Sequence, residues 1–84
     1  MNDILNAQLT IPFANEKHAK IVYETLRVDQ EPRKNLIQRQ LSLQSNLLII
    51  NWSAKESRIL RVSCQSILEH INSILNTIQA FELD

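Results

Sequence analysis

The last third of the chain carries an apolar stripe that constrains the fold more than any other feature. From Ala54 to Ala80 the apolar side chains recur at alternating intervals of three and four residues, as on one face of an α-helix. The stripe consists of Leu60, Cys64, Ile67, Ile71, Ile74, Ile78 and Phe81, and Leu68 and Leu75 widen it. A helix over this range is about 40 Å long at 1.5 Å per residue. The rest of the chain must supply a layer on which it can lie.

Three segments before the long helix are predicted to be strands. From Ile4 to Phe13 apolar and polar residues alternate, which is typical of a half-buried strand; Pro12 suits a strand end or an edge strand. The second strand, Leu36 to Leu43, has an apolar face that Arg39 interrupts. The third, Leu47 to Trp52, is apolar on both faces, which indicates a strand covered on both sides.

A shorter helix is predicted between the first two strands. Asn15 is suited to cap its N-terminus, and apolar residues follow at helical spacing as far as Val28. A polar loop from Asp29 to Asn35, which contains Pro32, leads to the second strand.

Two further local signals concern a turn and a helix start. Residues 44–46 form the predicted hairpin connection, where Asn46 is the residue that best tolerates left-handed backbone. Ser53 is predicted to cap the long helix, with Glu56 three residues later completing a capping box.

The element order is therefore β-α-β-β-α, in one domain that covers residues 1–84. The simplest α+β solution is a three-stranded antiparallel sheet with both helices on one face. The right-handed crossover rule places the third strand in the centre, giving the strand order 1-3-2.

This architecture leaves apolar surface without cover. Helices on one face can bury only one of the two apolar sets of the third strand. One set is Leu48, Ile50 and Trp52, the other is Leu47 and Ile49, and one of them remains uncovered. The long helix must also overhang the sheet, because a strand of about seven residues spans only about 23 Å. Exposed apolar patches of this kind mark interaction surfaces, so we expect partners.

The residues give no indication of an active site. Glycine is absent, which excludes the phosphate-binding loops that need it and the G-x-x-G loop of KH domains. Cys64 is the single cysteine and is predicted to be a small buried thiol. His18 and His70 have no ligand at metal spacing and are expected to meet solvent. We therefore expect no enzyme activity, cofactor or metal.

The charges are unevenly distributed along the chain. The formal net charge is zero, which favours association over repulsion. All Lys and Arg residues lie between Lys17 and Arg61, a span that holds nine basic and four acidic residues, a net +5. This span is either an ordinary solvated surface or a basic patch for an acidic partner such as tRNA. No apolar stretch is long enough to cross a membrane and no signal peptide is visible, so we expect an intracellular protein.

Two motifs resemble a known family. The first is the strand end Leu9-Thr10-Ile11-Pro12-Phe13, and the second is Arg58, Leu60, Arg61 and Ser66 at the start of the long helix. With the element order and the length, they resemble the small dimerising subunits of the KEOPS (EKC) tRNA-modification complex, which include the Pcc-type fungal proteins and the LAGE/CTAG antigens. The hairpin without glycine departs from that family.

The resemblance implies a non-catalytic accessory subunit of the complex that makes N6-threonylcarbamoyladenosine at position 37 of tRNAs reading ANN codons. It implies helices docked on the threonylcarbamoyl-transferase subunit, and a sheet side paired with a second copy or with a small, largely disordered subunit. It also implies a nuclear and cytoplasmic location, and links to telomere maintenance at telomeric chromatin and to transcription. The expected transferase contacts are Lys17, Lys20, Tyr23, Glu24, Arg58, Arg61 and Gln65, and the expected pairing contacts are Leu36, Ile37, Leu47 and Ile49.

Two other functions stay open at this point. A free-standing α+β RNA-binding module would use the basic span, although four aromatic residues (Phe13, Tyr23, Trp52 and Phe81) are few for a base-stacking surface. A small enzyme or ligand-binding homo-oligomer would need a carboxylate or histidine in a pocket.

Overall fold

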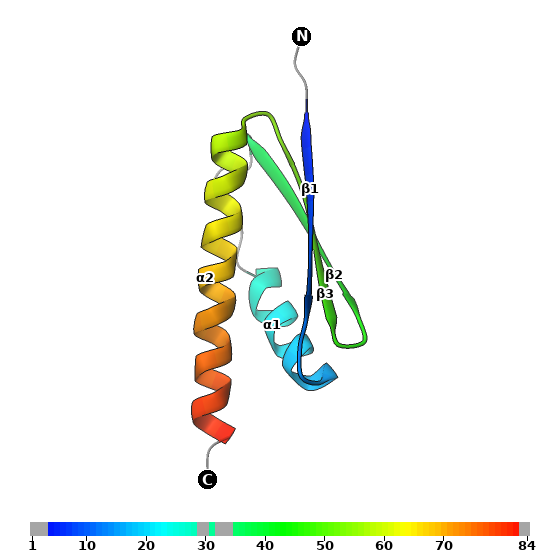
Figure 1. The fold of residues 1–84 in the computed structure, drawn as a ribbon, viewed down its shortest axis with the longest axis vertical. Coiled ribbons are helices and arrows are strands. Elements are labelled where there is room, and N and C mark those ends of the chain that lie inside the picture. The colour runs from blue at the N-terminus through cyan, green and yellow to red at the C-terminus, as the bar shows by residue number, and fades with distance from the viewer. Residues whose placement is uncertain (1–3, 29–30, 32–34, 83–84) are drawn as a thin grey trace.

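The computed structural model describes residues 4–28, 31 and 35–82. Figure 1 shows a sheet with two helices on one face. The elements are β1 (Leu5–Pro12), α1 (Glu16–Val28), β2 (Ile37–Gln44), β3 (Leu47–Ala54) and α2 (Ser57–Glu82). β3 lies between β1 and β2 and is antiparallel to both. The predicted α+β fold, with strand order 1-3-2, is confirmed.

The core lies between the sheet and the helices. β3 turns Leu48, Ile50 and Trp52 towards the helices, and all three are buried. α1 and α2 close the core from the other side with residues three to four positions apart, as an amphipathic helix requires. These buried residues are Ala19, Val22 and Leu26 of α1, and Ile59, Ser63, Ile67 and Ile71 of α2.

The two helix starts differ in how well the local sequence predicted them. Asn15 caps α1 as predicted: its Oδ1 accepts a hydrogen bond from the His18 N–H at 2.9 Å. The predicted cap at Ser53 is wrong. β3 continues to Ala54, and the first helical hydrogen bond of α2 runs from the Leu60 N–H to the Glu56 carbonyl. Ser53 stays in the strand because it has strand neighbours on both sides of it, in β1 and β2.

The hairpin between β2 and β3 has two turn residues, Ser45 and Asn46. The positive φ falls on Ser45 (53°) and not on the predicted Asn46. Asn46 instead holds the end of β1: its side-chain Nδ2 donates to the Phe13 carbonyl at 2.8 Å, and its carbonyl accepts from the Phe13 N–H at 2.9 Å. The hairpin and the loop after β1 are thereby joined.

Candidate functional site

The outer surface of α1 carries its predicted contact residues. Lys17, Lys20 and Glu24 are exposed, whereas Tyr23 is half-buried and packs against the core. Glu24 forms an ion pair with Arg27 at 3.7 Å, and both side chains are about half exposed to solvent. An exposed pair of this kind adds little stability, so a partner that displaced it would cost the fold little.

The outer surface of α2 carries the second predicted set. Arg58, Arg61 and Gln65 are all exposed, and their spacing places them on one side of the helix. The first turn of α2 contains no acidic residue, and Glu56 lies immediately before it. The two cations lie near the positive end of the helix dipole, where a cation is mildly unfavourable. An acidic partner surface is the natural complement of this turn.

The topology separates these two sets. β1 and β3 are antiparallel, so α1 begins at the end of the sheet where β1 ends and α2 begins at the opposite end. Figure 1 shows the two helix starts at opposite ends of the helix layer. Lys17 and Lys20 are therefore not brought next to Arg58 and Arg61. The predicted transferase surface consists of two patches, not one.

The long helix overhangs the sheet as predicted. α2 has 26 residues and each strand has 8, which correspond to about 39 Å and about 26 Å. Near the end of the stripe, Ile74 and Ile78 are only half-buried, and Phe81 is 86% exposed. This end of the core-facing stripe extends beyond the layer that should cover it.

An apolar groove lies between β1 and α2. It has a volume of about 390 Å³ and adjoins β1, which is an edge strand. Leu68 is 46% exposed, although it is a large apolar residue. The groove is lined by Ile11 from β1 and by Leu68, Glu69, Ile71, Asn72 and Leu75 from α2. An apolar groove beside an open strand edge fits a partner that adds both a strand and a helix.

The predicted pairing residues do not form one surface. Leu47 and Ile49 lie half-buried on the sheet face away from the helices; their role in pairing stays a prediction. Ile37 was placed there wrongly: it is 2% exposed and lies beside Ala54 in the core. Leu36 is exposed but lies in the turn before β2.

The open face of the sheet carries the apolar pair Leu47 and Ile49 without helix cover, as expected, but it is otherwise mostly polar. Apart from Leu47, Ile49 and Pro12, it consists of amides and hydroxyls, and Gln8 Nε2 donates to Asn51 Oδ1 at 3.0 Å. The polar members are Asn6, Gln8, Thr10, Gln38, Gln40, Ser42, Gln44, Asn51 and Ser53. The strand segments 5–12, 37–44 and 47–54 therefore present neither a cation nor an aromatic ring on this face, and RNA binding there has no support.

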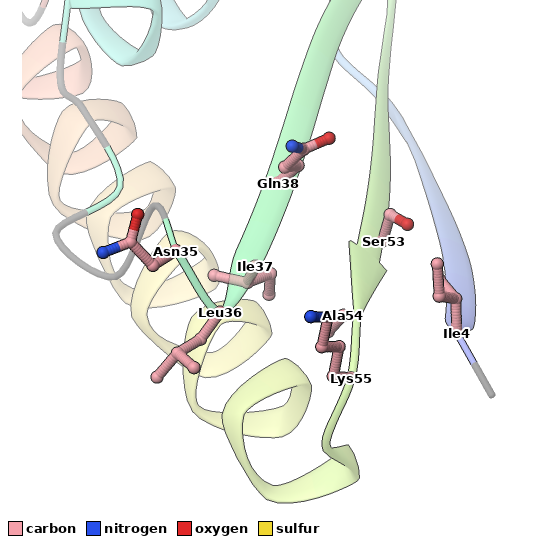
Figure 2. Close-up of a pocket in the computed structure, with 8 residues that line it drawn as sticks. All are labelled: Ile4, Asn35, Leu36, Ile37, Gln38, Ser53, Ala54 and Lys55. Carbon is pink, nitrogen blue, oxygen red and sulfur yellow. The ribbon is translucent and has the colours of Figure 1, made fainter. Parts of the chain in front are cut away.

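A small hollow opens at the end of the sheet where β1 begins and β3 ends (Figure 2). Its volume of about 130 Å³ is below the roughly 300–1,000 Å³ of small-molecule sites. Figure 2 shows Leu36 on the turn before β2 and Lys55 just after β3, both at this hollow. The other lining residues are Ile4, Asn35, Ile37, Gln38, Ser53 and Ala54. The hollow is too small to support a ligand-binding function.

A buried polar cluster, which the sequence did not predict, connects β2, β3 and α2 with the loop residue Glu31. Trp52 Nε1 donates to Ser63 Oγ at 3.1 Å, and the Ser63 hydroxyl donates to Glu31 Oε2 at 2.8 Å. Arg39 Nη1 lies 3.8 Å from the same Oε2, and the side chains of Arg39 and Glu31 are 11% and 7% exposed. We call Glu31, Arg39, Trp52 and Ser63 the Glu31 cluster. Of the predicted polar loop, only Glu31 and Asn35 are among the described residues.

The residue types that most often act as catalysts or metal ligands are dispersed over the structure. Cys64 is half-buried on α2, and burial raises the pKa of its thiol. His18 and His70 are half-buried, not fully exposed as expected, and both have interaction partners. Within residues 4–28, 31 and 35–82, no three His, Cys, Asp or Glu residues come together in a way that could hold a metal ion. None of the helices in this part of the chain has the length and apolar character needed to cross a bilayer.

The geometry agrees with a known family. Residues 6–79 match the family described as "Transcription factor Pcc1". The chain belongs to the Pcc1 family. This match covers every strand and both helices except the first residue of β1 and the last turn of α2.

Relatives of this Pcc1-family chain are named as subunits of the EKC/KEOPS complex. The EKC/KEOPS complex subunit LAGE3 of Homo sapiens is 29% identical over 73 residues, which are 87% of this chain and 51% of the human protein. An EKC/KEOPS complex subunit of Schizosaccharomyces pombe is 31% identical over 67 residues, which are 80% of this chain and 76% of that protein. The chain thus spans about half the length of the human relative.

A solved structure has the same fold. The crystal structure of a binary Gon7–Pcc1 complex matches with a TM-score of 0.83 and 26% identity, covering 93% of this chain and 96% of the matched chain. The agreement extends over nearly the whole domain, so the Pcc1 fold predicted from the resemblance is confirmed.

Proposed function

We propose that this chain is a non-catalytic subunit of an EKC/KEOPS complex that makes N6-threonylcarbamoyladenosine at position 37 of tRNAs reading ANN codons. The observation that carries the proposal is the Pcc1-family match over residues 6–79, with relatives named as EKC/KEOPS subunits. The chain would act by being bound, in the nucleus and cytoplasm, and its links to telomeres and transcription would follow from the complex.

The helix layer is the proposed contact with the transferase subunit. It presents two exposed charged patches, Lys17 with Lys20 and Arg58 with Arg61. Between and beyond them it presents apolar side chains, of which Val62 and Phe81 are 42% and 86% exposed. Cations at the edge of an apolar surface give orientation and association rate, and the apolar side chains give affinity.

Co-purification tests this contact. The tagged chain is expected to recover the transferase subunit, and the reversal Arg58→Glu with Arg61→Glu should lower the affinity at least tenfold, because it replaces attraction with repulsion. The control is Gln38→Glu with Gln40→Glu, which adds two carboxylates to the open sheet face and should leave the affinity unchanged. If the wild-type chain recovers no transferase subunit, the assignment is wrong.

The groove and edge of β1 form the proposed pairing surface, where a second copy or a small additional subunit would bind. A partner strand would satisfy the outward backbone groups of β1, and a partner helix would cover Leu68 and Leu75 in the groove. We prefer this surface to the predicted one, which consists of Leu47 and Ile49 with Ile37 or Leu36, because it joins an unpaired strand edge to an apolar groove.

Two substitutions on α2 test the pairing surface. Leu68→Glu places a carboxylate in the groove and should weaken pairing at least tenfold, as measured by sedimentation or native mass. Val62→Glu is the control, because Val62 is similarly exposed (42% against 46%) but is not among the groove residues. Equal effects of the two substitutions would contradict a pairing surface at the groove.

A further inference from the structure

The two edge strands of the sheet differ in charge. β1 and β2 each have 8 residues and one side without a strand neighbour, so each offers backbone groups to another chain. β1 contains no charged side chain, whereas β2 contains Arg39. The difference lies in a single row of the sheet, in which Ala7, Trp52 and Arg39 are neighbours.

Arg39 points towards the helix layer. Its register neighbour Trp52 is buried under the helices, and the Arg39 side chain is only 11% exposed although it lies on an edge strand. Its guanidinium lies 3.8 Å from the Glu31 carboxylate, which the Ser63 hydroxyl also contacts. A pair of charges is thus held inside the apolar layer, directly at the β2 edge.

A strand added to β2 would disturb this pair. It would place a side chain roughly 4.5–5.5 Å from the Arg39 Cβ on the same face and would remove the remaining water from both charges. Desolvation of an ion pair is unfavourable unless new partners replace the water. Inward-pointing charges are one of the means by which natural sheets protect an edge. At β1 the same row offers only Ala7, which imposes no such cost.

We propose that the Glu31 cluster closes the β2 edge, so that the chain associates through β1 alone and assembly stops after one pairing. The inference rests on the proposed pairing at β1. Without closure, a chain with two open edges would add copies at both and form an open ladder of sheets. The cluster is therefore a specificity device: it selects one edge and thereby limits the stoichiometry.

Neutralising the cluster tests the closure. In the variant Arg39→Val with Glu31→Gln, valine suits a strand and the glutamine amide oxygen still accepts from Ser63. Native mass and light scattering over a range of concentrations should show this variant forming assemblies at least twice the wild-type mass. The matched control is Arg27→Val with Glu24→Gln, which removes the same residue types from an exposed ion pair and should keep the wild-type mass.

A second variant separates this proposal from the pairing at β1. Ala7→Arg places an inward charge on the β1 edge and should convert the paired wild-type protein to single chains. Combining Ala7→Arg with the neutral cluster should restore association, now through β2. If Ala7→Arg leaves pairing intact, the pairing surface at β1 is wrong, whatever the cluster variant does.

The closure itself is overturned if the neutral-cluster variant is folded and keeps the wild-type mass in both backgrounds. Folding is monitored by far-UV circular dichroism and by the fluorescence of Trp52, the single tryptophan, which lies in the cluster. If the valine variant does not fold, Arg39→Gln with Glu31→Gln is measured instead. Larger assemblies of that variant support the closure, and an unchanged mass overturns it.

Discussion

The substitution Ser63→Ala tests whether the Glu31 cluster stabilises the monomer. Ser63 is fully buried, accepts from Trp52 Nε1 and donates to the Glu31 carboxylate. Its removal leaves the indole N–H without an acceptor in a buried site, which costs about 1–3 kcal/mol, and it deletes a hydrogen bond to a charged group, worth about 1.5–3 kcal/mol. One hydroxyl makes both hydrogen bonds, so the two costs are not simply added. The higher helix propensity of alanine offsets about 0.5 kcal/mol of the loss. We expect a net loss of about 2–4 kcal/mol.

This loss is large for so small a domain. At about 0.05–0.15 kcal/mol per residue, a chain of this length has a stability of roughly 4–12 kcal/mol. Urea unfolding followed by Trp52 fluorescence should show the midpoint falling by about 1.5–3 M, for a slope of about 1.3 kcal/mol per M.

The matched control is Ser66→Ala, on the same helix but exposed. It should change the stability by no more than about 0.5 kcal/mol. If the two variants unfold at the same urea concentration, within about 0.3 M, the hydroxyl of Ser63 is not a stabilising centre and the reasoning about the cluster fails.

Two further predictions concern single residues. Asn15→Ala should lower the stability by about 1 kcal/mol, because it removes the acceptor of the His18 N–H at the start of α1; thermal unfolding should show a decrease of roughly 4–8 °C. The control is Asn76→Ala, at an exposed position of α2 that is not among the groove residues. Cys64 concerns pH: burial raises the pKa of its thiol above the ordinary 9.0. The thiol therefore keeps its proton to a higher pH in the folded state than in the unfolded state. Its contribution to the stability is complete below the pKa of the unfolded state, and it is lost as the pH rises through the raised pKa of the folded state. Cys64→Ala should therefore reduce the decline in stability above about pH 9 in parallel urea titrations, and an unchanged decline would contradict this.

Local patterns predicted the elements, and long-range pairing decided where some of them end. The helical spacing of α2 and the Asn15 cap depend on residues within a few positions of one another, so the sequence predicts both. The stripe is shifted in its first turns, where Ile59 and Ser63 are buried and the predicted Leu60 and Cys64 are half-buried. Ser53 and Glu56 match a capping box equally well, but the strand neighbours of Ser53 are Asn6 and Gln38, which are remote in sequence. The pairing with two neighbouring strands outweighs a single cap.

The assignment of Ile37 to the pairing surface failed because it did not follow the alternation along its own strand. Residues two apart lie on the same face, so Ile37 shares the apolar face with Leu41 and Leu43, and Leu36 lies on the other face. The register with Ala54 agrees with this alternation and places Ile37 in the core.

The Glu31 cluster was not predicted because its members are distant in the sequence. Ser63 lies 32 residues from Glu31 and 11 from Trp52, and neither distance matches a local motif. One signal was present: Arg39 interrupts an otherwise apolar strand face. A charge at such a position needs a partner, and the structure shows Glu31 in that role.

The antiparallel sheet also sets a condition on any partner of the helix layer. Because α1 and α2 begin at opposite ends of the sheet, Lys17 and Lys20 lie at one end of the layer and Arg58 and Arg61 at the other. A partner that contacts both patches must extend along most of α2, whose 26 residues span about 39 Å at 1.5 Å per residue. A short peptide motif would reach one patch only, and charge reversal at the other would leave its affinity unchanged. A helical lobe of similar length would lose affinity on reversal at either end, so comparing the two reversals with the same transferase subunit distinguishes a full-length contact from a local one.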